Sequence, residues 1–267
     1  MKVAFGVEYD GSQFVGWQRQ KTGRTVQACV EEALSSVADT PIKVYCAGRT
    51  DTGVHATGQV IHIETSAERS ARSWVLGANS NLPADISVQW AHEVDNNFHA
   101  RFSAVGRIYR YIICNRLARP GLWSNKVTFI YRALDAELMA QASRCLIGKH
   151  DFSSFRAVGC QAPHAIRDVR RINILRTGEY VTIVIEANAF LQHMVRNIVG
   201  TLLCVGDGRS PPGWVAQVLG ARDRTAGGVT APAYGLYLSA VTYPDQFGLP
   251  RLVAQRSPWT LLDQVCN

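Results

Sequence analysis

The sequence predicts an α+β protein built from two halves, each with the element order β-α-β-β-α-β. Segments in which apolar and polar residues alternate are interleaved with segments in which apolar residues recur at helical spacing. The same order occurs twice along the chain, and 267 residues with 47% hydrophobic content suffice for one large or two small cores. The order is that of the ferredoxin-like motif. We therefore expect two antiparallel sheets, each covered by helices on one face, joined around a central cleft suited to a large ligand.

The first half is predicted to span residues 1–104. Residues 3–9, "VAFGVEY", alternate as a strand does. The next helix has Thr25 as a plausible N-cap, and one stripe carries its apolar residues Val26, Val30, Leu34 and Val37. The remaining predicted elements are strands over 41–48 and 58–65, a helix over 71–82 and a strand over 85–94.

The second half is predicted to span residues 105–248. It begins with a strand over 106–115 and a helix over 135–148 that Asp135 caps. A hairpin turns about Thr177 and Gly178. The other predicted elements are the hairpin strands over 165–176 and 180–187, helices over 190–206 and 211–221, and a strand over 235–243. Residues 249–267 form a C-terminal tail without a strong pattern.

Composition argues against several classes of protein. No apolar run approaches the roughly 18 to 20 residues that span a bilayer. The N-terminus lacks a signal-peptide pattern because Glu8 and Asp10 interrupt its apolar stretch. The seven cysteines include no CxxC spacing, and the seven histidines are scattered. We therefore expect a cytoplasmic protein with no membrane segment and no metal site.

The charge of the chain indicates a polyanionic partner. Lysine and arginine total 28 against 21 acidic residues, which gives a formal charge of +7. Most of the basic residues are arginines, whose planar guanidinium binds phosphate in two-point fashion and stacks on bases. Nucleic acid is the partner that this surplus favours.

The stretch "AGRTDTGVHA" contains the Asp-Thr-Gly triplet of aspartic proteases at Asp51, Thr52 and Gly53. Those enzymes need two carboxylates that share one proton, and the chain has no second triplet. Arg49 lies two residues away and favours an ionised carboxylate instead. A protease is therefore excluded. Asp51 is either a lone reactive carboxylate, presented between two strands, or a capping residue in a tight turn.

"GRTDTGVHATGQ" resembles the catalytic signature of the tRNA pseudouridine synthase A family, usually written GRTDxGVHA. Further blocks resemble the family in the family order: "VEYDGSQFVGWQRQ", "FHARFSA", "YRYIICN", "FSSFRAV", "NAFLQHMVRNIVG" and "GLYLSAV". The resemblance covers the chain up to about Gly248.

This resemblance implies the pseudouridine synthase fold and an isomerase that acts on tRNA. The substrates would be uridines at positions 38, 39 and 40, in the anticodon stem-loop. The bond between uracil N1 and the ribose would break, and the base would rejoin the ribose through C5. No cofactor or metal is implied. The resemblance alone implies a homodimer, with one tRNA reaching across both subunits.

By the same resemblance, Asp51 is the catalytic residue, as nucleophile or base. Attack on C1′, attack on C6 and removal of the 2′ proton all remain open. Arg196 lies on a mostly apolar helix, where an unpaired charge is costly. The family places a basic residue here against the catalytic carboxylate, which would keep Asp51 charged. The alternative is that Arg196 extends from the helix edge into solvent.

Three further residues are expected to bind the substrate. Tyr109 would stack on the extruded uracil, whereas Tyr111 on the same strand face suits a core position. Leu236 would pack against the other side of the base. Arg49 would pair with Asp51 or hold a phosphate of the flipped nucleotide.

Extruding a base from a stem costs free energy, which contacts spread along the RNA backbone must offset. Arginines in predicted loops and element ends are candidates for phosphate contacts. These are Arg24, Arg69, Arg101, Arg116 and Arg156.

The chain departs from the family pattern in two places. Thr52 stands where the family often has alanine, and residues 161–165 match less well, which bears on target preference. One alternative function is a catalytically inactive RNA-binding or chaperone protein of the same fold, against which intact Asp51, Arg49, Tyr109 and Arg196 argue. Another is a metabolic α+β enzyme with a small acidic substrate, which the spread of arginines disfavours.

Overall fold

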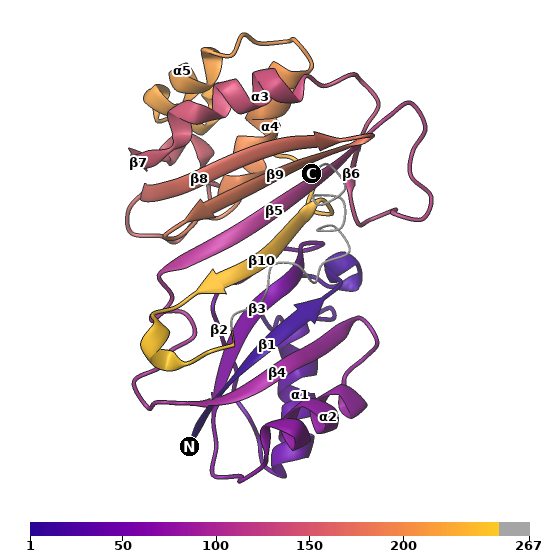
Figure 1. Ribbon diagram of the computed structural model, residues 1–267, viewed down its shortest axis with the longest axis vertical. Helices are drawn as coiled ribbons and strands as arrows, with labels where there is room; N and C mark the ends of the chain where they lie inside the picture. Colours follow the sequence, from indigo (N-terminus) through magenta and orange to yellow (C-terminus); the bar gives the residue numbers. More distant parts are fainter. Residues whose placement is uncertain (251–267) are drawn as a thin grey trace. The chain divides into compact units, whose positions relative to one another are not determined.

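The computed structural model describes residues 1–250 (Figure 1). Of the predicted tail, all but the first two residues lie outside this range. The described chain divides into two compact units: Met1–Val105 together with the chain from Tyr237 on, and Gly106–Leu236. Within residues 1–250, none of the helices has the length and apolar character needed to cross a membrane.

The first unit has the predicted order of elements. It contains β1 (Lys2–Tyr9), α1 (Val26–Ala38), β2 (Tyr45–Cys46), β3 (His55–Glu64), α2 (Ala71–Asn81) and β4 (Ile86–Val94). Strand β1 pairs antiparallel with both β3 and β4, and β2 pairs antiparallel with β3. The resulting order β4-β1-β3-β2 is that of a ferredoxin-like sheet, with β1 at its centre.

The helices of the first unit begin where the sequence provides caps. Thr25 accepts a hydrogen bond from the Ala28 amide (3.4 Å), and Ser70 accepts one from the Ser73 amide (3.1 Å). In α1, three of the four stripe residues are buried, and Val37 is half-buried. Helix α2 packs on the sheet through Trp74, whose ring meets the Phe5 ring edge-on at 5.8 Å.

Most of the last described strand, β10 (Leu236–Thr242), groups with the first unit, which resumes at Tyr237. It pairs parallel with β3, with Tyr237 opposite His55 and Leu238 opposite Ala56. The two strands approach so closely at Gly58 that a Cβ there would lie 2.2 Å from the Ser239 oxygen. This pairing joins strands far apart in the sequence, and a repeated element order does not reveal it.

A hydrophobic cluster covers the second face of the first sheet. Ala4 and Val60 contribute from the strands, and Phe98, Ala100 and Phe247 from segments that cross over them. Part of this face, which the sequence predicts to be open, is therefore occupied by the chain itself.

The second unit holds the remaining elements. These are β5 (Gly106–Asn115), β6 (Thr128–Ile130), α3 (Ala136–Ser143), β7 (Gly148–Asp151), β8 (Ile166–Thr177), β9 (Tyr180–Ala187), α4 (Met194–Gly206) and α5 (Trp214–Ala221). Its antiparallel sheet has the order β5-β9-β8-β7, and β6 pairs parallel with β5. Asp135 caps α3 at the Leu138 amide (2.9 Å), and the β8–β9 hairpin turns at Gly178, where φ is +55°. The predicted mixed α+β class is confirmed.

Three elements differ from their predicted extents for local reasons. The strand predicted over 41–48 shrinks to β2, because the Ile42 amide donates to the Ser35 hydroxyl (2.9 Å) and the Val44 amide to the Glu31 carboxylate (3.2 Å). The helix predicted over 190–206 begins at Met194, because His193 adopts a left-handed conformation with φ of 61°. The helix predicted over 135–148 ends at Ser143, and the chain then continues through a short 3-10 turn into β7.

Candidate active site

Asp51 lies in the loop between β2 and β3 and is half-buried. The fully buried side-chain amide of Gln59 fixes the start of this loop. Its oxygen accepts from the Gly48 amide (3.3 Å), and its nitrogen donates to the Gly48 oxygen (2.6 Å). A glutamine inside the sheet thus replaces the ladder bonds that Gly48 lacks.

Thr50, the residue before Asp51, is held on both its side chain and its backbone. The Tyr9 and Thr50 hydroxyl groups form a buried hydrogen bond of 2.8 Å. The Trp17 amide donates to the Thr50 oxygen (3.0 Å). Gly16 permits this approach, because a Cβ there would lie 2.8 Å from the same oxygen.

Asp51 itself opens a tight turn. The Val54 amide donates back to the Asp51 oxygen (3.1 Å), and Gly53 sits in the turn with φ of +78°. The Gly53 amide donates to the Phe14 oxygen (3.4 Å), which attaches the turn to the segment after β1. The Asp51 carboxylate is therefore carried on a backbone that is fixed before and after it, as a reactive group requires.

His55 follows this turn, and its side chain is buried. Its Nδ1 accepts from the Gly11 amide at 3.0 Å and lies 3.1 Å from an Asp10 carboxylate oxygen. Its ring stacks on Tyr237 at 4.6 Å. These contacts join the Asp51 turn to β10, so the last strand of the chain supports the first unit's candidate site.

Arg49 and Thr52 flank Asp51 and are both exposed. The nearby Cys46 thiol has its pKa raised to about 12, mainly by burial, while the Arg49 and Arg101 guanidinium groups lower it. The thiol is therefore protonated at neutral pH and chemically inert.

In the second unit, Tyr109 and Tyr111 occupy different surroundings on one face of β5. Tyr109 is half-buried opposite Ile185, and its ring meets the Phe190 ring edge-on at 4.9 Å. Tyr111 is fully buried; its hydroxyl contacts the Thr128 hydroxyl (2.5 Å) and donates to the Pro232 oxygen (2.8 Å). Burial also raises the pKa of Tyr111 well above its usual value. The prediction that Tyr111 is a core tyrosine is confirmed.

Arg196 is half-buried on α4, and its predicted core-facing neighbours Val195, Val199 and Leu202 are all buried. Its Nε donates to the Ala231 oxygen (2.7 Å), and the Ala231 amide donates back to the Arg196 oxygen (3.1 Å). The guanidinium is thus oriented by the backbone beside α4. Leu236, at the start of β10, is buried at 5% exposure.

These residues fall into two sets. Asp51 and Arg49 belong to the first unit, and Tyr109, Arg196 and Leu236 belong to the second. The pairing of Arg196 with Asp51 stays a prediction.

Three of the five predicted phosphate-binding arginines already have protein partners. Arg24 forms a two-point ion pair with Asp85 (2.5 and 2.8 Å) and lies 4.2 Å above the Phe14 ring. Arg116 pairs with Glu179 (2.9 Å). Arg156 donates to the oxygens of Cys160 (2.5 Å) and Ala162 (2.9 Å), and so holds the start of the divergent segment 161–165.

The other two are exposed on the first unit. Arg69 precedes α2 and bonds only to the neighbouring Glu68 oxygen among the hydrogen bonds of the described chain (3.0 Å). Arg101 lies 5.6 Å from the centre of the Phe102 ring. Whether any of the five arginines contacts phosphate stays a prediction.

Sequence reasoning missed the residues that position the Asp51 turn. Tyr9 and Gln59 look like ordinary strand residues in the sequence, and only strand pairing brings them to the loop. A metal site was not predicted; within residues 1–250, no three histidine, cysteine or acidic side chains are arranged to hold an ion.

The chain is similar to several known proteins. Residues 6–103 and 142–244 match the family model described as tRNA pseudouridine synthase. A tRNA pseudouridine synthase A of Escherichia fergusonii is 56% identical over 250 residues, covering 94% of this chain and 93% of its own length. Relatives of the same name from Escherichia coli O1:K1 / APEC and Salmonella paratyphi B match with the same identity and coverage. A chain from a crystal structure of a Cbf5-Nop10-Gar1 complex matches 76% of this chain and 45% of its own at 13% identity, and its TM-score of 0.36 is too low to bear on the fold.

Proposed function

The chain belongs to the tRNA pseudouridine synthase family and is therefore an isomerase of uridine in tRNA; from this premise we propose that it acts at positions 38, 39 and 40 of the anticodon stem-loop, with Asp51 as the catalytic carboxylate. The reaction breaks the bond between C1′ and N1 of uracil and forms the bond between C1′ and C5. The proton leaves C5 for solvent, and N1 gains one, so atoms and electrons balance without a co-reactant.

The observation that carries the role of Asp51 is the fixed backbone of its turn. Thr50 is hydrogen-bonded through its hydroxyl and through its backbone oxygen, and Gly53 adopts the left-handed conformation that lets the chain reverse. A carboxylate that acts as nucleophile or base must be held close to its target atom, and positioning of this kind contributes strongly to rate. A surface-capping aspartate has no need of such support.

The other site residues complete the proposal. Tyr109 stacks on the extruded uracil, as its half-buried place on β5 suits. Leu236 packs on the other side of the base, and Arg49 binds the phosphate of the flipped nucleotide. Arg196 supplies the positive charge that keeps Asp51 ionised.

We further propose a cytoplasmic homodimer that needs no cofactor or metal. The family resemblance supports dimerisation, and the chemistry consumes nothing beyond the substrate. The net charge of +7 supports a long electrostatic contact with the phosphates of tRNA.

Release of tritium from tRNA labelled at uracil C5 tests the reaction and the role of Asp51. C5 loses its hydrogen only when it becomes the glycosidic carbon. Wild type is expected to release tritium, and Asp51→Asn to lose at least about 10²-fold in rate while retaining tRNA binding. Asp39→Asn is the matched control, because Asp39 is an exposed carboxylate in a left-handed position that asparagine also favours. Equal activity of the Asp51 and Asp39 variants would remove Asp51 from the chemistry.

Substrates with a single uridine test the choice of position. Anticodon stem-loops that carry uridine only at position 38, 39 or 40 are each expected to release tritium. A stem-loop with its only uridines elsewhere is expected to release none. Activity on that control, or inactivity on all three substrates, contradicts the proposed positions.

A pH–rate profile tests the proposed role of Arg196. If its charge stabilises the catalytic carboxylate, then the acid limb of kcat moves to higher pH in Arg196→Gln. Arg196→Lys retains the charge and is expected to leave the limb near its wild-type position. A limb that does not move in Arg196→Gln contradicts the pairing.

A further inference from the structure

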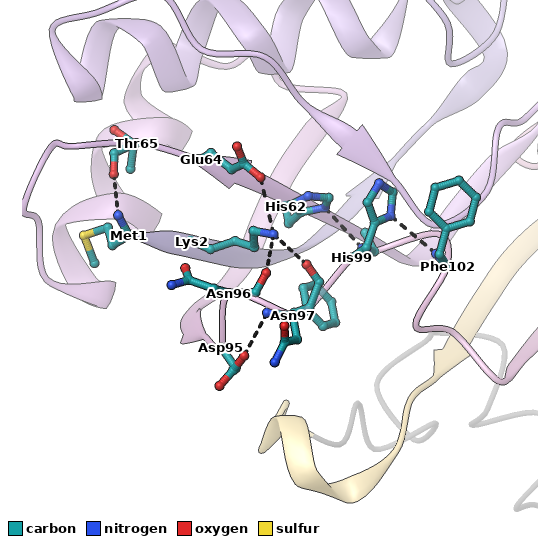
Figure 2. A network of polar contacts seen from close by, with 12 residues as sticks. Met1, Lys2, His62, Glu64, Thr65, Asp95, Asn96, Asn97, His99 and Phe102 are labelled. Atoms are coloured by element: carbon teal, nitrogen blue, oxygen red, sulfur yellow. Dashed lines mark hydrogen bonds and ion pairs between the residues drawn. The ribbon is translucent and has the colours of Figure 1, made fainter.

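A row of rings lies in the first unit. It consists of Tyr45, His62, His99 and Phe102, with Lys43 at one end and Arg101 at the other; we call these six residues the ring row. Tyr45 stacks on His62 at 4.9 Å, His62 meets His99 at 4.7 Å, and His99 meets Phe102 at 4.4 Å. Figure 2 shows His62, His99 and Phe102 following one another along this side.

Both histidines hold the backbone of the next segment through their ring nitrogens. His62 Nδ1 accepts from the Ala100 amide (3.1 Å). His99 Nδ1 accepts from the Arg101 amide (3.1 Å) and the Phe102 amide (3.4 Å). A nitrogen that accepts these bonds carries no proton, and burial lowers the pKa of both rings, that of His62 to about 4. Both histidine rings are therefore neutral at physiological pH.

The Lys2 side chain holds residues 96–98, just before the segment that the histidines hold. Its ammonium donates to the oxygens of Asn96 (2.8 Å) and Phe98 (3.0 Å). It also pairs with Glu64 (3.3 Å), and Figure 2 shows Lys2 between Asn96 and Glu64. The chain that leads to Phe102 is thus fixed at several points, yet the Phe102 side chain is 75% exposed. The Phe102 ring is therefore presented to solvent from a segment whose backbone is held in place.

A cation lies at each end of the row. Lys43 Nζ lies 5.2 Å from the centre of the Tyr45 ring, and the Arg101 guanidinium lies 5.6 Å from that of Phe102. An aromatic ring flanked by cations can bind a base and its neighbouring phosphates. The ring can stack on any base, and the cations contact the phosphate groups of the backbone. A stem hides its base faces, so the matching partner is an unpaired nucleotide.

We propose that the ring row is a stacking platform on which an unpaired base of the tRNA substrate, other than the target uridine, lies against Phe102 while Arg101 and Lys43 contact the flanking phosphates. This inference rests on the proposed function, since it takes tRNA as the ligand. Tyr45 belongs to β2, which directly precedes the Asp51 loop in the chain.

Filter binding of an unmodified tRNA transcript to three variants tests the platform. Phe102→Leu keeps apolar volume but removes the aromatic face, and we expect it to weaken binding at least about fivefold. Phe102→Trp keeps the face and is expected to bind within about twofold of wild type. Arg101→Gln is expected to reduce the slope of log Kd against log salt by about one. Unchanged urea midpoints would show that each variant is folded.

Three outcomes overturn the proposal. The first is wild-type binding by Phe102→Leu. The second is equal loss by Phe102→Leu and Phe102→Trp, which would mean that stacking is not involved. The third is a changed oligomeric state of Phe102→Leu in sedimentation with unchanged tRNA affinity, which would assign the row to a contact between two copies of the chain.

A photocrosslink identifies the nucleotide. With benzoylphenylalanine at position 102, we expect crosslinks to an unpaired nucleotide of the tRNA. Crosslinks only to stem nucleotides, or only to a second protein chain, contradict the platform. Tritium release by wild type separates the two proposals. If wild type releases tritium but the Phe102 variants contradict the platform, the proposed function stands and only the platform is wrong. If wild type neither releases tritium nor binds tRNA, both proposals are wrong.

Discussion

The hydroxyl groups of Tyr9 and Thr50 lie 2.8 Å apart in a buried hydrogen bond that joins the end of β1 to the residue before Asp51. Tyr9 is only 4% exposed, and Thr50 is 8% exposed. A central strand of the sheet therefore sets the position of the turn that carries the carboxylate. Tyr9 is a positioning residue rather than a catalytic one, because it acts through Thr50.

Removing this bond should reduce turnover more than substrate binding. Tyr9→Phe leaves the Thr50 hydroxyl buried without that partner, and we expect a loss of about 1 to 3 kcal/mol in unfolding free energy. A displaced turn lowers kcat for tritium release, and KM should change little because the phosphate contacts remain.

A second tyrosine of the first unit provides the control. The Tyr243 hydroxyl donates to the Ala100 oxygen (2.6 Å), away from the Asp51 turn in sequence. Tyr243→Phe should also destabilise the fold while leaving kcat near wild type. Equal changes of kcat in both variants would show that Tyr9 acts only through general stability.

Gly16 should tolerate no side chain. Its φ is +101°, and a Cβ would lie 2.8 Å from the Thr50 oxygen, so Gly16→Ala must displace the backbone next to Asp51. We expect lower stability in urea and a lower kcat. Gly178→Ala is the matched control: it also has a positive φ (+55°), but nothing lies within 4 Å of the added Cβ. That variant should lose about 1 kcal/mol from backbone strain and keep its kcat. Full activity of Gly16→Ala would contradict the tight packing of the turn.

Periodicity and capping residues predicted most of the helices and strands because those signals are local. Thr25 and Asp135 cap the helices that they were predicted to cap. The strand over 41–48 was predicted too long, because two of its amides bond to side chains of α1 rather than to another strand. The parallel pairing of β10 with β3 joins strands about 180 residues apart, and no local pattern encodes it.

The candidate site was predictable where it rests on a motif and unpredictable where it rests on packing. Asp51 stands out in "GRTDTGVHA", but Gln59 and Tyr9 have no sequence signal beyond their polarity in apolar strands. The partners of the surface arginines were equally hidden, since Asp85 meets Arg24 from 61 residues away. Charge counts predict a partner for the chain as a whole and not for each side chain.

His62 should make the stability of the protein depend on pH. Burial, together with His99 and Lys2, lowers its pKa from 6.5 to about 4, while Glu64 acts in the opposite direction. A neutral histidine in the fold that protonates more easily when unfolded contributes stability above pH 6.5, and that stability is lost as pH falls toward 4. Between about pH 7.5 and 5 the loss should be about 2 kcal/mol.

His62→Asn isolates this effect, because its side-chain oxygen can accept from the Ala100 amide without titrating in this range. Urea unfolding at the two pH values should show about 2 kcal/mol less loss for the variant than for wild type. Equal losses would mean that His62 does not protonate on unfolding in this range.

Arg24 should differ from Arg69 and Arg101 in how it affects tRNA binding. Its guanidinium is already engaged by both oxygens of Asp85, whereas Arg69 and Arg101 are exposed. A cation that neutralises a phosphate releases a counterion, so its removal lowers the slope of log Kd against log salt by about one. We expect this change for Arg69→Gln and Arg101→Gln and no change for Arg24→Gln. Asp85→Asn completes the test, because it frees the Arg24 guanidinium and should steepen the slope only when Arg24 is present. A lower slope in Arg24→Gln than in wild type would show instead that tRNA displaces Asp85 and that a tRNA phosphate binds the Arg24 guanidinium.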